Sequence, residues 1–265
     1  MLLQTSLQTW AALRFGVVKP RTQKYHQELI AYVGRQWPEK FMEDVEQISE
    51  LHLGVFIGRI ASLSDSRFNG VVTMLRATVP AAKKLPRRRL RLKERPLINH
   101  TEFSILLEKL DARPRSHAGL VIRFLAHTGL RINEARQIKW NDIHDNFLLL
   151  PGRLAKNSQA RVIPFVKGLR ETLEALRRVA GNRETVIPQA ECKRSLRTAC
   201  ELAGLHRLTH HDFRHLFTTR CIESGVDIPT VARWRGDKDG GAMLVKTYFH
   251  LLDDHSRRMA ERVRI

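Results

Sequence analysis

The sequence predicts a mainly helical protein with one small β-sheet, arranged as two domains. Three observations support this prediction. Apolar residues recur at three- and four-residue steps through most of the chain, as is typical of amphipathic helices. Two short β-rich runs occur in "NFLLLPGRLAKNSQARVIPF", residues 146–165, around polar, glycine and proline residues. A dense basic stretch over residues 83–95, most of it between Pro86 and Pro96, interrupts the helical pattern and divides the chain.

The first domain is expected to cover residues 1–82 and to be helical. Residues 21–37 and 51–63 have apolar positions at helical spacing and no useful β alternation. "SDSRFNGVVTMLRATV", residues 64–79, begins with capping residues and predicts another helix. A segment of this length can bury a core of its own.

The second domain is expected to cover residues 96–265. Asn99 and Glu102 are three residues apart and mark the start of a helix. A hairpin or small sheet over residues 146–165 interrupts the helical pattern. The remaining helices are predicted over residues 119–130, 168–181, 191–205, 208–225 and from residue 227.

The basic stretch between the two domains, residues 83–95, contains eight Lys or Arg and one Glu. Such a run is either a solvated tether or a linker that lies along a phosphate backbone. The second interpretation makes its cations candidate DNA-binding residues: Lys83, Lys84, Arg87, Arg88, Arg89 and Arg91.

The charge of the whole chain favours a polyanionic partner. Lys and Arg number 46 against 27 Asp and Glu, which gives a formal net charge of +19. Binding to nucleic acid is favoured because each cation that neutralises a phosphate releases condensed counterions. No apolar run is long enough to span a bilayer, and the N-terminal sequence lacks signal-peptide features, so a cytoplasmic location without membrane is expected. The three cysteines have no metal-ligand spacing.

"LTHHDFRHLFTTR", residues 208–220, places His211, Arg214 and His215 on one helix face. A zinc site is one interpretation, but a permanently charged arginine between two ligands opposes a dication. A solvated basic face is another, yet Phe213 and Phe217 on the same helix indicate burial. A face that binds a phosphate is the third interpretation.

Other motifs occur in a specific order. "HTGLRINEARQIKW" contains Arg131 and Glu134, "LAKNSQARVIP" contains Lys156, and "WRGDKDGGAMLVKTYFHL" contains Tyr248. Together with the His-x-x-Arg pair of residues 211–214, they make the chain resemble the tyrosine recombinase (phage integrase) family from about residue 96 onward. The resemblance implies a catalytic domain there and, less specifically, a helical core-DNA-binding domain before it.

The resemblance also implies roles for individual residues. Tyr248 would attack a DNA phosphate and form a 3′-phosphotyrosyl intermediate, so that strands are cleaved and rejoined without a cofactor. Arg131 and Arg214 would bind the non-bridging oxygens, a task suited to planar guanidinium groups. Lys156 would protonate the departing 5′-oxygen, and His211 would take part in proton transfer. The partner would be double-stranded DNA, with a homotetramer on two DNA sites.

Glu134 and Asp212 are expected to orient this set, and His215 and His250 to be structural. Asp237 is a departure, because the family usually has His or Trp there, which can donate a hydrogen bond to the phosphate. An ionised aspartate cannot donate one. Its carboxylate would repel the phosphate unless it pairs with an arginine such as Arg235 or turns outward.

Two alternatives follow from these observations. Asp237 allows a catalytically impaired, recombinase-derived DNA-binding protein. The phosphotyrosyl reaction is also that of type IB topoisomerases. DNA cleavage and rejoining by a site-specific recombinase is the leading prediction.

Overall fold

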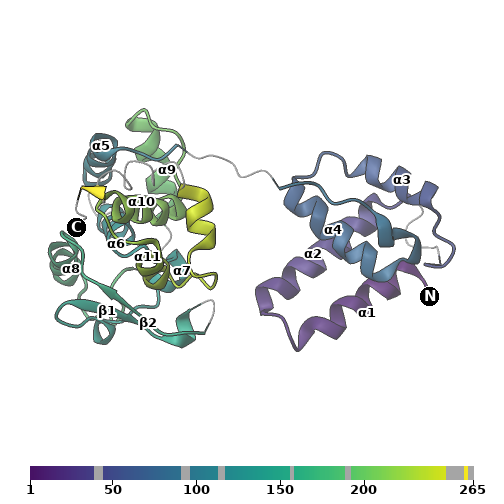
Figure 1. The fold of residues 1–265 in the computed structure, drawn as a ribbon, viewed down its shortest axis with the longest axis horizontal. Helices are drawn as coiled ribbons and strands as arrows, with labels where there is room; N and C mark the ends of the chain where they lie inside the picture. Colours follow the sequence, from purple (N-terminus) through teal and green to yellow (C-terminus); the bar gives the residue numbers. More distant parts are fainter. Residues whose placement is uncertain are drawn as a thin grey trace. The chain divides into compact units, whose positions relative to one another are not determined.

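The computed structural model describes residues 1–38, 44–90, 96–112, 117–155, 158–188, 192–248 and 260–261. These residues are mostly helical, with one two-stranded antiparallel sheet, and the predicted fold class is confirmed (Figure 1). The chain forms two compact units, Met1–Glu94 and Arg95–Ile265. No helix of the described residues is both long and apolar enough to cross a membrane.

The described residues of unit 1 form the helices α1 (Leu3–Phe15), α2 (Pro20–Gln36), α3 (Glu50–Arg59) and α4 (Asp65–Thr78) and the short 3-10 helix η1 (Pro80–Lys84). Helix α4 packs against α1, α2 and η1. Phe56, Val71 and Leu75 are among the fully buried side chains of its core. Proline in the first turn starts α2, and a reciprocal Ser49–His52 capping box starts α3, as expected for helix N-termini.

The segment expected to begin the linker is packed against unit 1 as far as the structure describes it. Lys83 and Lys84 end η1. The Arg88 guanidinium donates hydrogen bonds to the carbonyls of Leu63 (2.7 Å) and Ala61 (2.8 Å) and lies 3.9 Å from the centre of the Phe68 ring. Residues 83–90 therefore belong to unit 1. Arg91 lies outside the described residues.

Unit 2 is organised around two buried helices, α6 (Ala118–Thr128) and α10 (His210–Glu223), which pack against each other. Helix α6 also contacts α5 (His100–Asp111) and α8 (Leu169–Arg178), while α9 (Lys193–Leu202) packs on α5. Their apolar faces form one core that contains Leu106, Phe124 and Phe213. Helix α10 is buried on most of its surface, so several of its polar side chains are buried as well, among them Arg214 and Thr218.

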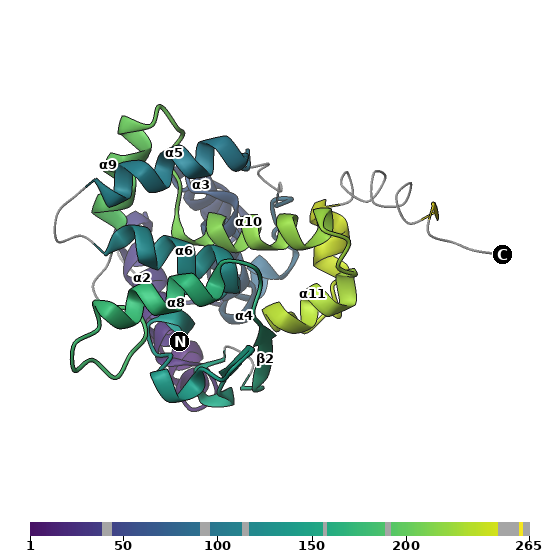
Figure 2. The ribbon, with the colours of Figure 1, turned by 90° about the vertical axis from the view of Figure 1, so that its left-hand side faces the viewer.

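The sheet consists of β1 (Phe147–Leu150) and β2 (Arg161–Pro164), with Leu148 opposite Ile163. Figure 2 shows β2 beside α11 (Ile228–Arg235), a contact that brings the sheet close to the C-terminal helices. The short helix α7 (Ile132–Ala135) follows α6, and residues 242–248 form a further helical segment. Two more 3-10 turns, η2 (Trp140–Asp142) and η3 (Gly152–Leu154), flank β1. Of the predicted site residues, Arg131, Glu134, Arg214 and Asp237 come together where α7, α10, β2 and α11 meet.

Candidate active site

Arg131 follows a turn at the end of α6 that requires glycine. Gly129 has a left-handed backbone, with φ of 62°. A Cβ atom at this position would lie 2.4 Å from the ring of Phe217 on α10. A side chain would therefore be strained and would also push the two helices apart. This close approach brings Arg131, at the start of α7, next to the buried helix that contains Arg214.

Glu134 fixes the orientation of Arg131. It is 3% exposed and accepts hydrogen bonds from both the backbone N–H and Nη1 of Arg131, each at 3.0 Å. Arg161 Nη2 donates to the same carboxylate at 2.7 Å, while Arg161 Nε donates to the carbonyl of Trp234. Burial alone would raise the pKa of Glu134, but hydrogen bonds and charges from Arg161 and Arg131 outweigh it and lower this pKa. Glu134 is therefore an anion at neutral pH, as its expected orienting role requires.

Arg214 is the most deeply buried cation among these residues, at 1% exposure. Its Nη1 donates to the carbonyl of Gly129 at 2.7 Å, and its Nη2 donates to the carbonyl of Arg235 at 3.0 Å. Burial and the neighbouring Arg235 and Arg131 charges lower the pKa of Arg214 to about 9. It remains a cation at neutral pH, and a nearby anion stabilises that charge.

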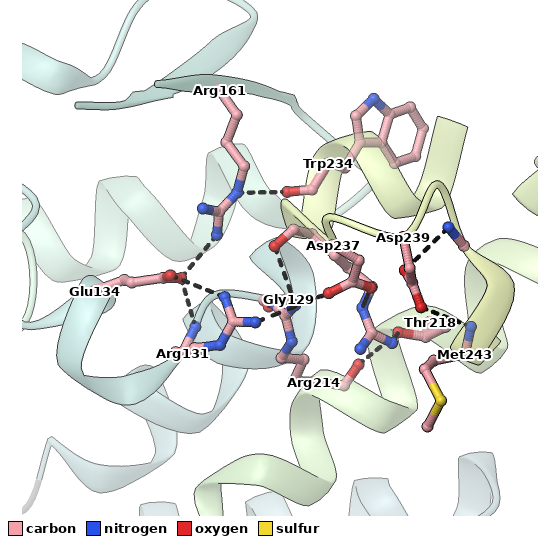
Figure 3. Close-up of polar contacts among 12 residues, drawn as sticks. Gly129, Arg131, Glu134, Arg161, Arg214, Thr218, Trp234, Asp237, Asp239 and Met243 are labelled. Carbon is pink, nitrogen blue, oxygen red and sulfur yellow. Dashed lines mark hydrogen bonds and ion pairs between the residues drawn. The ribbon is translucent and has the colours of Figure 1, made fainter. Parts of the chain in front are cut away.

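The carboxylate of Asp237 lies between the guanidinium groups of Arg131 and Arg214 (Figure 3). Its Oδ1 is 3.0 Å from Arg214 Nη2 and 3.8 Å from Arg131 Nη2. Its Oδ2 is 2.9 Å from Arg235 Nε. We call the position between Arg131 and Arg214 the anion site. An oxyanion that belongs to the chain itself occupies it in this structure.

From the sequence, the Asp237 carboxylate is expected to repel a bound phosphate unless it pairs with an arginine or turns outward. The pairing with Arg235 is one of the two accommodations that were considered. The contacts with Arg131 and Arg214 are additional, because the carboxylate enters the anion site instead of turning outward. Asp237 therefore contacts both arginines that were predicted to bind phosphate.

Tyr248 lies in helical segment 242–248 and is 2% exposed. Its ring packs in a cluster with Phe217, Val231 and Leu244, and its hydroxyl is 2.6 Å from Nδ1 of His215. Burial raises the pKa of Tyr248, while Arg235 and Thr218 beside the hydroxyl oppose that rise. The hydroxyl is thus neutral at physiological pH and needs a proton acceptor to become a nucleophile.

The sequence did not predict that His215 contacts Tyr248. It was expected to be structural, yet its imidazole contacts the Tyr248 hydroxyl. The available signal was its position on the same helix face as His211 and Arg214. That spacing could not show that Tyr248, 33 residues later in the chain, would fold back onto this face.

His211 and Asp212 occupy the N-terminal turn of α10. His211 is exposed, and its ring meets that of His215 edge-on, with centroids 4.7 Å apart. Asp212 Oδ2 accepts hydrogen bonds from the backbone N–H and the hydroxyl of Thr209, both at 2.7 Å. Asp212 thus caps the N-terminus of α10, the helix that contains Arg214.

Two further predicted residues cannot be placed: Lys156 and His250 lie outside the described residues. Of the basic residues near the end of unit 1, Lys83, Lys84, Arg87 and Arg89 are exposed, and Arg87 donates to the hydroxyl of Thr73 at 2.8 Å. Among the residues that the structure describes, no three His, Cys, Asp or Glu side chains lie close enough together to bind a metal ion.

The site thus combines a buried tyrosine with two arginines, the buried Arg214 and the partly exposed Arg131, on a helical domain with a small sheet. The sequence model of the phage integrase family matches residues 96–255, and the chain belongs to this family. It is similar to the tyrosine recombinase XerA of Saccharolobus solfataricus, with 29% identity over 153 residues that cover 56% of this chain and 50% of XerA. It is also similar to XerC of Corynebacterium efficiens, with 27% identity over 44% of this chain and 41% of XerC. The matched region thus spans about half the length of these curated relatives.

Solved structures show the same fold. A lambda integrase dimer bound to a COC′ core site matches with a TM-score of 0.76 and 18% identity, over 91% of this chain and 96% of that chain. The Tn1549 transposon integrase in complex with transposon right end DNA matches with a TM-score of 0.74 and 16% identity, over 99% of both chains. At these identities the likeness concerns the fold of the backbone.

Proposed function

We propose that this chain is a site-specific DNA recombinase that cleaves and rejoins DNA through a 3′-phosphotyrosyl bond to Tyr248. Membership of the phage integrase family supports DNA strand transfer as the class of reaction. The tyrosine recombinases and DNA-bound integrases that resemble the chain support site-specific recombination. Residues of this chain supply the chemical argument.

The observation that supports the proposal most directly is the anion site. Arg131 and Arg214 come from segments separated by 83 residues (214 − 131), yet both lie against one oxyanion, the carboxylate of Asp237. Helix α10, which positions Arg214, also positions His215 against the hydroxyl of Tyr248. An oxyanion bound by two guanidinium groups beside a tyrosine hydroxyl is the arrangement that attack on a phosphodiester needs.

In the proposed cleavage step, the Tyr248 oxygen forms a bond to phosphorus and the bond from phosphorus to the 5′-oxygen breaks. The phenolic proton passes to Nδ1 of His215, which lies 2.6 Å from the hydroxyl. Arg131 and Arg214 bind the non-bridging oxygens after Asp237 has left the anion site. One phosphodiester replaces another, so the bond energy is conserved and the reverse step rejoins the strand without a nucleotide cofactor.

The departing 5′-oxygen requires a proton. The family resemblance assigns this proton to Lys156, with His211 as a further proton-transfer group. Exposed His211 adjoins His215 at the open end of α10, where a DNA phosphate could approach it. Glu134 keeps Arg131 in place through two hydrogen bonds and does not itself react.

Double-stranded DNA is the proposed partner, and a homotetramer on two DNA sites is the proposed assembly. A lambda integrase tetramer bound to a Holliday junction has the same fold, with a TM-score of 0.74 and 18% identity over 90% of this chain. The net charge of +19 supports a polyanionic partner independently of that likeness.

One observation favours a second candidate function, a DNA-binding protein without cleavage activity. Asp237 occupies the anion site, and an enzyme that could not release this carboxylate would bind DNA and leave it intact. The two candidates predict the same DNA affinity and opposite results in a cleavage assay.

We expect Tyr248→Phe to abolish the covalent complex with a suicide DNA substrate and to leave DNA affinity nearly unchanged, because only the hydroxyl is removed. Tyr25→Phe, a change in unit 1, is the matched control and should cleave as the wild type does. Denaturing gels would detect the adduct, with and without EDTA, which should have no effect. An adduct that persists in Tyr248→Phe would disprove this nucleophile, and a wild-type chain that binds without forming an adduct would favour the second candidate.

A further inference from the structure

Arg235 is a buried cation to which neither the sequence motifs nor the proposed step assigns a role. It ends α11 and is 8% exposed, and its charge acts on Cys221 and Tyr248, two members of an apolar cluster. Burial of a guanidinium group in such surroundings costs desolvation energy that an apolar side chain would avoid. A purely structural position in this cluster would therefore not need an arginine.

The guanidinium group of Arg235 contacts two different groups of the site. Its Nε is 2.9 Å from Oδ2 of Asp237, the carboxylate in the anion site. Its Nη1 donates a hydrogen bond of 2.6 Å to the hydroxyl of Thr218 on α10. The opposite ends of one rigid, planar group thus reach the anion site and the surface of α10.

Thr218 marks the place of the nucleophile. It lies three residues after His215 on α10, so the two side chains share the face against which the Tyr248 hydroxyl packs. Both Thr218 and Arg235 lie beside that hydroxyl. Arg235 thus contacts the carboxylate in the anion site and, through Thr218, the face of α10 on which the Tyr248 hydroxyl lies.

We propose that Arg235 is a further catalytic residue of the proposed cleavage reaction, whose guanidinium group binds the attacking oxygen of Tyr248 and donates to the phosphate in the anion site. It supplies, from two residues earlier in the chain, the hydrogen-bond donor that Asp237 cannot provide. This inference rests on the proposed function.

The inferred role of Arg235 depends on where negative charge develops during the reaction. As the phenolic proton moves to His215 and the new O–P bond forms, negative charge develops on the tyrosine oxygen and on the equatorial phosphate oxygens. A fixed cation next to both positions stabilises that charge without reorganisation. Once a phosphate takes over the contacts of Arg131 and Arg214 and Asp237 leaves the anion site, Nε of Arg235 becomes available to donate to that phosphate, while the hydrogen bond from Nη1 to Thr218 keeps the guanidinium group oriented.

Titration of Tyr248 without DNA tests the contact with the attacking oxygen. Fluorotyrosine incorporated into the full chain lowers the titration range, and 19F NMR separates the three tyrosines, with Tyr248→Phe to assign the signal. We expect Arg235→Gln to raise the pKa of Tyr248 by about one unit, because a cation close to the hydroxyl is removed. Arg233→Gln, an exposed arginine on the same helix, should leave it unchanged. An unmoved pKa in Arg235→Gln would overturn the proposal.

Single-turnover cleavage tests the catalytic role. Arg235→Gln should slow covalent-complex formation by about a hundredfold, the usual effect of removing one donor to a transition state. The deficit should shrink at higher pH, and DNA affinity should stay within about threefold. Arg235→Lys should recover part of the rate, because it keeps the charge but not the planar geometry.

A double-mutant cycle separates this role from simple neutralisation of Asp237. If Arg235 served only as a counter-ion, Arg235→Gln would cost nothing in an Asp237→Asn background. We expect the deficit to persist there. A deficit that vanishes, or Arg235→Gln cleaving at the wild-type rate, would refute the catalytic role while leaving the proposed function intact. A wild-type chain without any adduct would instead overturn the proposed function and this role together.

Discussion

Asp237 has two opposing effects on a phosphate that approaches Arg131 and Arg214. Its negative charge keeps both guanidinium groups in place before DNA binds. The same charge must move aside, or be screened, when the phosphate enters. Two unit charges about 4 Å apart repel by about 4 kcal/mol at an effective dielectric constant near 20, which corresponds to roughly three decades in rate.

We expect Asp237→His to raise the rate of covalent-complex formation with little change in DNA affinity. The gain should be about tenfold or more and below the thousandfold limit set by the repulsion, because Arg131, Arg214 and Arg235 already screen the carboxylate. Single-turnover cleavage of a suicide substrate measures it. Glu223→Gln removes one negative charge from the exposed end of α10 and should have no effect. A rate that stays level or falls in Asp237→His would show that the carboxylate is already fully accommodated.

For individual residues, sequence motifs predicted which residues belong to the candidate site, but they did not predict which side chains contact each other. Arg131, Arg214 and Tyr248 could be found because their order and spacing are specific, and Asp237 because it breaks the pattern. The contacts of His215 and Arg235 could not be inferred, since both depend on where α11 and segment 242–248 pack against α10. Helical periodicity defines a face of one helix and does not say what will cover it.

At the scale of secondary-structure elements, Glu134 and Arg161 join α7, β2 and α11. Arg161 is 5% exposed and Glu134 3% exposed, and the pair is 2.7 Å apart. Arg161 also donates to the carbonyl of Trp234 in α11. A buried ion pair of this kind fixes the relative positions of the three elements, which is what places Arg131 and Asp237 opposite each other.

Glu134→Gln should lower the free energy of unfolding of unit 2 by about 3 to 5 kcal/mol, because it leaves Arg161 buried without a counter-charge. Hydrogen exchange of amides in α6 and α10, measured by mass spectrometry, reports on this unit alone. Glu184→Gln, which removes an exposed partner of Lys139, is the control and should change nothing measurable. Equal protection in Glu134→Gln and wild type would contradict the structural role of the pair.

This effect should also depend on pH. The pKa of Glu134 is lower in the folded chain than in the unfolded chain. Its contribution to stability is therefore present above the unfolded pKa and is lost as the pH falls through the folded pKa. The difference between wild type and Glu134→Gln should consequently shrink in acid.

Most elements could be predicted because their apolar spacing and caps are regular. Helix α1 was not identified individually, although Leu3, Leu7, Trp10 and Ala11 are buried on one side of it. Exposed Leu13 on the same helix blurs the amphipathic pattern. The two strands could be predicted as a hairpin, whereas the contact of β2 with α11 is long-range and leaves no local signal.

At the scale of the whole molecule, the basic segment has two kinds of arginine. Arg88 is bound to unit 1 by hydrogen bonds to two carbonyls and by its contact with Phe68. Arg89 and Lys84 are exposed. The charge run could be seen in the sequence, but the contacts of Arg88 with residues 19 to 27 positions earlier could not.

We expect Arg87→Gln combined with Arg89→Gln to weaken binding to all DNA sequences alike. The slope of log affinity against log salt should fall by about 0.9 for each phosphate that the variant no longer neutralises. Arg88→Gln should leave that slope unchanged and reduce the stability of unit 1, because its hydrogen bonds are internal. Salt titrations of the three proteins would show this, and an unchanged slope in the double variant would mean that these exposed arginines do not contact DNA.

Because Asp237 occupies the anion site, DNA binding and DNA cleavage would depend on different residues in the proposed recombinase. A phosphate must displace Asp237 before it meets Arg131 and Arg214, so this exchange adds little net attraction at the reacting position. In the recombinase proposed here, affinity would then come mainly from cations elsewhere, such as those on unit 1. Its nucleophile would stay buried while the chain is bound, and a strand would be cleaved only where the duplex is held long enough for the exchange to occur.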